Sequence, residues 1–147
     1  MQKSCPFMLV VLCTALAASG CGANPATGPS PVVSTDAFIR AVEDQGVRIT
    51  RMEEMPRQSH PFFSVPAQRL TVSGENVYVF QYASAPEADR EAATISRDGS
   101  QVGNSHIDWI GPPRFYRKDR LIVLYVGATQ DVVRALESVL GNPVAAR

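Results

Sequence analysis

Apolar residues recur at three- and four-residue spacing in three segments of the chain, and each recurrence predicts a helix with one buried face. The expected helices begin near Ser34 or Thr35, near Ser84 and near Thr129, and they end at Gly46, Asp98-Gly99 and Gly141. Their apolar stripes are Phe38, Ala41 and Val42; Ala85, Ala88, Ala92 and Ile95; and Val132, Leu136, Val139 and Leu140. Serine and threonine suit a helix start because their oxygen atoms accept backbone N–H bonds, and Ser84 with Glu87 has the spacing of a capping box.

Between these segments apolar and polar residues alternate, which predicts strands. The expected strands are residues 47–52, 69–73, 76–82, 106–110, 114–117 and 121–126, with hairpin turns at 73–76 and 118–119. Residues 121–126 are apolar on both faces, which indicates a central strand covered on both sides. Pro61-Phe62-Phe63 is too apolar for a free loop, so we expect at least one of these rings to pack on the core.

The order of the elements predicts an α+β fold with a single domain, an antiparallel sheet of about six strands and three helices packed largely on one face. The order helix, strand, hairpin occurs twice, which suggests two related halves, although residue identity between them is low. The predicted domain covers residues 35–142, and residues 143–147 form a C-terminal tail. A chain of 147 residues that is 45% hydrophobic and 19% charged suits one such domain.

The first residues have the organisation of a secretory signal: a positive Lys3, an apolar run over residues 6–16 and small residues before Cys21. The run is shorter than the ~20 apolar residues that span a bilayer. The segment resembles the lipobox of bacterial lipoproteins, with Ala18 where leucine is usual. The resemblance implies that residues 1–20 are removed and that Cys21 carries a diacylglyceryl thioether. The alternative is an ordinary signal, cut near Ala18 or Gly20, that leaves a free cysteine.

Residues 22–34 contain three prolines, two glycines and no charge, which is typical of a linker. Residues 21–34 are therefore expected to form a lipidated cysteine and a flexible tether. Only Val32 and Val33 would gain from docking on the domain. If extended at ~3.1 Å per residue, the tether would place the domain up to ~35 Å from the lipid surface.

A second resemblance lies within the predicted domain. Phe115–Gly141, together with Asn76–Phe80 and Asp108–Ile110, resembles a group of small, uncharacterised bacterial lipoproteins. This resemblance implies a lipid-anchored protein at the cell membrane or outer membrane, facing the periplasm or the exterior. It implies no activity.

Charge and cysteine content narrow the possible functions. Fourteen basic and fourteen acidic residues give no net charge, so we expect no nucleic-acid partner. Cys5, Cys13 and Cys21 all precede the predicted domain, which would then have no disulfide and no thiolate ligand. The two histidines, His60 and His106, lack the spacing of metal ligands, so no metal or cofactor is expected.

One basic and aromatic concentration is a candidate surface for a ligand or partner. It comprises Trp109, Arg114, Phe115, Tyr116, Arg117 and Lys118, with Arg120 nearby. Guanidinium groups beside aromatic rings can bind an anionic group or an acidic patch. The alternative is the solvated tip of a hairpin beside the core, with Trp109 packed in the core because Ile107 shares its face.

These observations favour a non-enzymatic binding domain, held at the membrane through Cys21, with an envelope protein as its partner. A first alternative is a small envelope hydrolase that uses His60 or His106. Ser105 and His106 suggest a triad with Asp108, but adjacent side chains on a strand point to opposite faces. A second alternative is a secreted inhibitor that presents the loop from His60 to Pro66.

Overall fold

The protein is described as a computed structural model that covers residues 31–147. The predicted signal peptide, the predicted lipidation site Cys21 and residues 22–30 of the predicted linker lie outside the described residues. The helices are α1 (Thr35–Glu43), the short 3-10 helix η1 (Arg57–Ser59), α2 (Ala85–Ala92) and α3 (Gln130–Leu140). The strands are β1 (Ile49–Met55), β2 (Ala67–Val72), β3 (Glu75–Gln81), β4 (Gln101–Val102), β5 (Ser105–His106), β6 (Pro113–Lys118), β7 (Leu121–Val126) and β8 (Ala145–Ala146).

A six-stranded antiparallel sheet in the order β1-β2-β3-β7-β6-β8 organises the domain. The predicted α+β class and six-stranded sheet are confirmed. The central pairing of β3 with β7 joins the N-terminal hairpin to the C-terminal one. No helix in residues 31–147 has the length and apolar character needed to cross a membrane.

Two of the predicted elements differ from the observed sheet. In place of the expected strand 106–110 there is only the two-residue strand Ser105–His106. It pairs with Gln101–Val102 in a separate two-stranded hairpin. The sixth strand of the main sheet comes instead from the expected C-terminal tail. Ala145 is buried beside Phe115, and the Val144 N–H donates to the Phe115 carbonyl oxygen at 2.7 Å. Pairing with β6 satisfies backbone groups at the end of the chain, which local pattern could not reveal.

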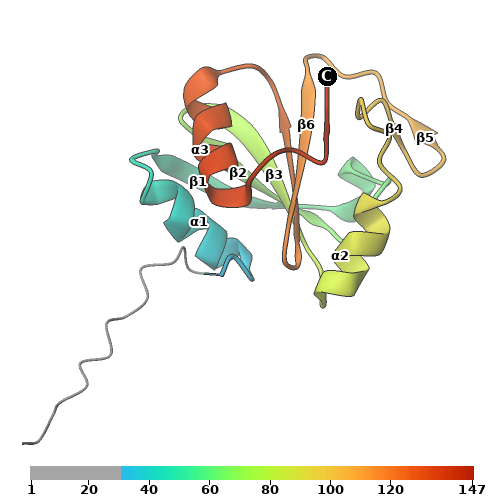
Figure 1. Cartoon of the computed structure of the whole chain (residues 1–147), viewed down its shortest axis with the longest axis horizontal. Coiled ribbons are helices and arrows are strands. Elements are labelled where there is room, and N and C mark those ends of the chain that lie inside the picture. Colours follow the sequence, from blue (N-terminus) through green and yellow to red (C-terminus); the bar gives the residue numbers. More distant parts are fainter. Residues whose placement is uncertain (1–30) are drawn as a thin grey trace, which may run out of the picture.

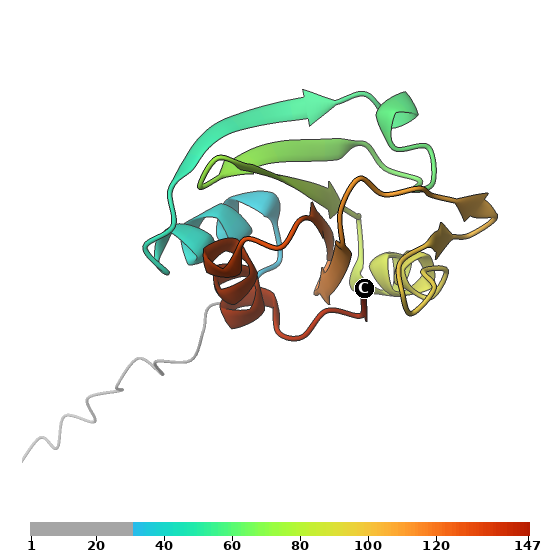
Figure 2. The same cartoon turned by 90° about the horizontal axis from the view of Figure 1, so that it is seen from above.

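The sheet is covered on both faces, so the expectation that the helices pack largely on one face holds for α1 and α3 but not for α2. Leu121, Val123 and Tyr125 of β7 face a core shared with α1 and α3. Ile122 and Leu124 face a second core, which includes Ala88 of α2. Figures 1 and 2 show α1 beside α3, with α2 on the other side of β6. A central strand that is apolar on both faces needs cover on both, as predicted for residues 121–126.

The starts of the three helices differ in how they are capped. Ser34 caps α1 as predicted, because its Oγ accepts from the Ala37 N–H at 3.2 Å. The predicted capping by Ser84 and Thr129 is wrong, since neither side chain bonds its helix terminus. Thr129 donates instead to Glu75 Oε1 at 3.0 Å, which ties the start of α3 to the β2–β3 hairpin.

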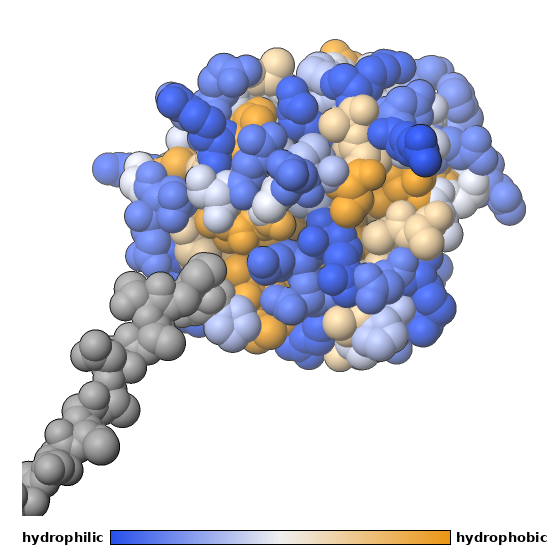
Figure 3. All heavy atoms as spheres, in the orientation of Figure 1, coloured by the Kyte–Doolittle hydropathy of each residue, from blue (hydrophilic) through white to orange (hydrophobic). Residues whose placement is uncertain are grey.

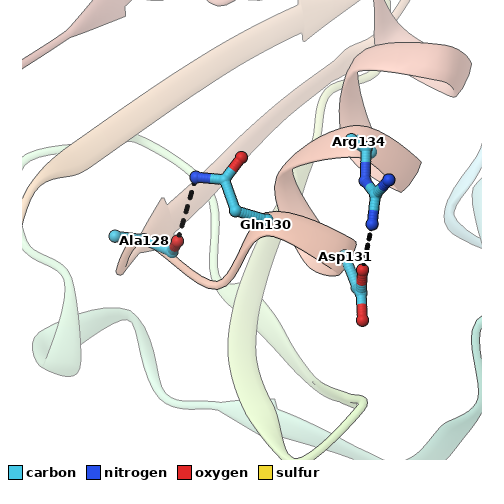
Figure 4. A network of polar contacts seen from close by, with 4 residues as sticks. All are labelled: Ala128, Gln130, Asp131 and Arg134. Atoms are coloured by element: carbon cyan, nitrogen blue, oxygen red, sulfur yellow. Dashed lines mark hydrogen bonds and ion pairs between the residues drawn. The ribbon is translucent and has the colours of Figure 1, made fainter.

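Two polar contacts lie at the start of α3 (Figure 4). The Gln130 side-chain amide donates to the Ala128 carbonyl oxygen at 3.5 Å. Asp131 forms an ion pair with Arg134 one turn later. A carboxylate in a first helical turn also interacts favourably with the helix dipole.

Packing begins before the expected end of the linker. Val32 is 3% exposed and belongs to the core under α1 and α3. Arg120, at the turn between β6 and β7, donates from Nε to the Val33 carbonyl oxygen at 3.0 Å. The Thr35 N–H donates to Gln81 Oε1 at 2.8 Å. Figure 3 shows apolar surface near the point where the described chain begins. The tether is therefore attached to the domain from Val32 onward.

Candidate binding groove

The face of the sheet that carries α2 is only partly covered. In the antiparallel register, Glu53, Arg69, Tyr78 and Leu124 lie side by side in one row across β1, β2, β3 and β7. Neither α2 nor the β4–β5 hairpin contributes to the lining over Tyr78 and Leu124. A half-covered sheet face between two loops is a suitable place for a ligand or partner to bind.

The first wall of this open region is the segment after β1. It includes η1, and the His60 N–H donates to the Arg57 carbonyl oxygen at 3.1 Å. The predicted anchoring of Pro61-Phe62-Phe63 is confirmed, because Phe63 is buried with its ring centre 4.7 Å from that of Phe80. The His60 ring centre lies 4.5 Å from that of Tyr78. The buried Phe63 thus holds His60 against the floor of the sheet.

The second wall follows β5 and is supported by the turn before β4. Asp98 Oδ1 accepts from the Ser96 hydroxyl at 2.7 Å and from the Ser100 N–H at 3.1 Å. These bonds lower the pKa of Asp98 to about 2. The ordered turn directs the Gly99 carbonyl oxygen to the indole N–H of Trp109, at 2.7 Å. Trp109 is therefore fixed in orientation by a backbone acceptor ten residues earlier.

Between the two walls is a groove of about 400 Å³, which we call the aromatic groove. Its lining comes from the two walls, from the first half of β3 and from the end of β7. The lining residues are Ser59, His60, Phe62, Glu75, Asn76, Tyr78, Ile107, Asp108, Trp109, Ile110, Leu124 and Val126. Figure 2 shows η1 and the β4–β5 hairpin at the same end of the molecule. The ring centres of Phe62 and Trp109, one from each wall, are 6.1 Å apart.

The charged side chains that line the groove are acidic. Glu75 and Asp108 supply carboxylates, and no lysine or arginine is among the described residues that line it. Burial lowers the pKa of His60, so this ring is neutral at neutral pH. Its Nδ1 is buried without a hydrogen-bond partner among the described residues. The groove therefore combines aromatic rings with net negative charge.

The basic and aromatic surface expected from the sequence is not a single surface. Phe115 and Tyr116 are both 0% exposed and lie in the two different cores. Alternation along β6 therefore places Arg114 and Lys118 with Tyr116 on one face, and Arg117 on the other. Adjacent residues of a strand cannot present one continuous patch, so the interpretation of these residues as a joint binding surface is wrong.

Two arginines of this hairpin, Arg117 and Arg120, have structural partners. Arg117 forms an ion pair of 2.7 Å with Asp89 of α2. Arg120 bonds the carbonyl oxygens of Val33 and Ala83 at 3.0 and 3.4 Å. These guanidinium groups hold α2 and the start of the domain in place. Of the predicted surface, only Trp109 lies in the aromatic groove.

The histidines do not form a catalytic group with other described residues. His60 contacts the rings of Phe62, Tyr78 and Phe80, and His106 lies exposed on β5. In residues 31–147 neither side chain is hydrogen-bonded to a carboxylate or hydroxyl. Nor do histidines and carboxylates gather in threes as metal ligands within this part of the chain.

Sequence patterns pointed to Trp109 but missed its neighbours. Phe62 lies in the segment after β1, whereas Glu75 and Tyr78 belong to β3, and only the tertiary fold brings these two segments to Trp109. Ile110, which the sequence placed at the end of an expected strand, belongs to no strand and is fully exposed. No family model, curated protein or solved structure matches the chain.

Proposed function

We propose that the protein is a bacterial lipoprotein whose α+β domain binds a protein partner of the cell envelope through the aromatic groove. The observation that carries the binding role is the open groove with fully exposed Ile110 at its rim. A concave site lined by aromatic and apolar side chains with a few polar groups is typical of binding sites.

The membrane anchor is part of the same proposal and rests on the lipobox resemblance. Acyl chains on Cys21 would hold the protein at the cell membrane or outer membrane, on the periplasmic or exterior side. Two or three chains give stable anchoring, since each buried methylene contributes ~0.8 kcal/mol. With packing beginning at Val32, the intervening residues 22–31 would span at most ~30 Å when extended. A partner would then be met close to the membrane surface.

The anchor is tested by intact mass spectrometry of the natural protein. We expect the mature chain to begin at Cys21 and to carry the mass of a diacylglyceryl group, with further acyl mass if the amino group is also modified. The Cys21→Ser variant should accumulate without this mass. A natural chain that begins at another residue, or carries a free thiol at Cys21, contradicts the anchor.

The groove is tested by chemical crosslinking of the full chain in native membranes, followed by affinity isolation. Ile110→Asp places a charge at the rim without disturbing the core, because Ile110 is fully exposed. Met52→Asp is the matched control, since Met52 is also an exposed apolar residue but lies opposite Leu70, on the other face of the sheet. We expect a crosslinked protein that is lost with Ile110→Asp and kept with Met52→Asp. Equal recovery with both variants contradicts the groove as the binding site.

A further inference from the structure

The charge of the aromatic groove restricts what can bind there. Glu75 and Asp108 are the carboxylates of its lining, and no described lining residue is a lysine or arginine. The nearest cation in the same row of the sheet, Arg69, is already paired with Glu53. An anionic ligand would meet two like charges in the groove, whereas a cation would meet two opposite ones.

The rings of the groove favour the same sign of charge. Phe62, Tyr78 and Trp109 line it, and the faces of such rings attract an ammonium or guanidinium group within about 6 Å. Burial lowers the pKa of His60, so its ring adds no opposing positive charge at neutral pH. A groove that combines aromatic rings with carboxylates therefore suits a cation carried on an apolar stem.

Resting on the function proposed above, we propose that the occupant of the aromatic groove is an arginine or lysine side chain of the partner protein, flanked by apolar residues. The carboxylates of Glu75 and Asp108 balance its charge, and the rings contact its methylene stem. A polypeptide is favoured over a small amine because Ile110 is fully exposed at the rim. An amine inside the groove would leave Ile110 in water, whereas an apolar neighbour of the basic residue would cover it.

The test uses two capped peptides, Leu-Arg-Leu and Leu-citrulline-Leu, which have nearly the same shape but differ by one positive charge. The protein contains one tryptophan, so the indole N–H signal of Trp109 in NMR spectra of the full chain in detergent reports on this groove alone. We expect both peptides to shift that signal. The arginine peptide should bind about three- to tenfold more tightly, a preference that decreases as salt is added.

A double variant tests the two carboxylates directly. Glu75→Gln with Asp108→Asn keeps side-chain size and leaves an oxygen that can accept from Thr129, so the preference for arginine over citrulline should disappear while citrulline binding is retained. The matched control, Glu43→Gln with Glu137→Gln, removes two exposed carboxylates from α1 and α3 and should keep the preference.

Three results would overturn the inference. Equal binding of the two peptides removes the assignment of a cation but leaves the groove as a partner site. If neither peptide shifts the Trp109 signal, the assignment of a cation is also removed. The crosslinking experiment with Ile110→Asp then decides separately whether a partner binds in the groove. Binding of ethylammonium as tightly as the arginine peptide would assign the groove to small amines rather than to a polypeptide.

Discussion

Trp109 and Gly99 are joined by a hydrogen bond of 2.7 Å, in which the indole N–H donates to the backbone carbonyl oxygen. The bond connects the wall of the aromatic groove to the turn that precedes β4, in which Gly99 is buried. A ring at a groove is useful for recognition only if its orientation is fixed, because ordering it on binding would cost conformational entropy. The bond therefore links the packing of the domain to its proposed site.

The Trp109→Phe variant tests this bond. Phenylalanine can keep part of the contact with Phe62 and Phe115 but leaves the Gly99 carbonyl oxygen without its donor. We expect a loss of about 1–3 kcal/mol in the free energy of unfolding, measured with urea. Ile110→Ala, a change at the fully exposed neighbour, should stay within about 0.5 kcal/mol of the wild type. Equal effects would mean that the indole bond adds nothing to stability.

Gly99→Ala tests the close packing of the same turn. Gly99 has φ of +68°, and an added Cβ would lie 3.1 Å from both Phe115 and Pro113. Backbone strain and overpacking together should cost about 2–4 kcal/mol. Gly103 has φ of +56° and nothing within 4 Å of such a Cβ, so Gly103→Ala should show the strain alone, about 1–2 kcal/mol. If thermal or urea unfolding gives the two variants the same loss of unfolding free energy, the close contact with Phe115 and Pro113 does not add to the cost of Gly99→Ala.

Val32→Ala tests whether the tether is packed into the domain. Val32 is 3% exposed and Val33 is 42% exposed, so the two neighbours form a matched pair. Val32→Ala should cost about 1–3 kcal/mol in urea unfolding of the full chain, since it leaves a cavity under α1 and α3. Val33→Ala should change the free energy of unfolding by less than about 0.5 kcal/mol. A neutral Val32→Ala would place the start of the domain after this residue.

His60 makes stability depend on pH in a predictable direction. Burial lowers its pKa in the folded state below the ordinary 6.5, so the unfolded chain binds more protons as the pH falls. The contribution of neutral His60 is fully present above about pH 6.5 and is lost progressively below it. His60→Gln should therefore lose less unfolding free energy than the wild type between about pH 7 and pH 5. Parallel curves for the wild type and His60→Gln would contradict the burial of this ring.

Local patterns predicted those parts of the fold that depend on local interactions. Residues 121–126 were expected to be a central strand covered on both sides, and β7 has this place in the sheet. The first helix begins at its predicted cap because Ser34 needs only the N–H three residues later. Thr129 shows the limit of such reasoning, since a hydroxyl that suits a cap bonds a distant carboxylate when the fold brings one near.

The sequence by itself determined the class of fold, the central strand, the anchoring of the Phe62–Phe63 loop and the expectation of a lipid anchor on Cys21. The class of fold follows from the order of the elements along the chain, and the other three depend on spacing or on a short motif. Only the tertiary structure decided that α2 lies opposite α1 and α3, that Ala145–Ala146 completes the sheet, and which residues form the aromatic groove. The physical reason is that sheet pairing and a groove join segments far apart in the chain, and periodicity shows that a residue is buried without showing what covers it.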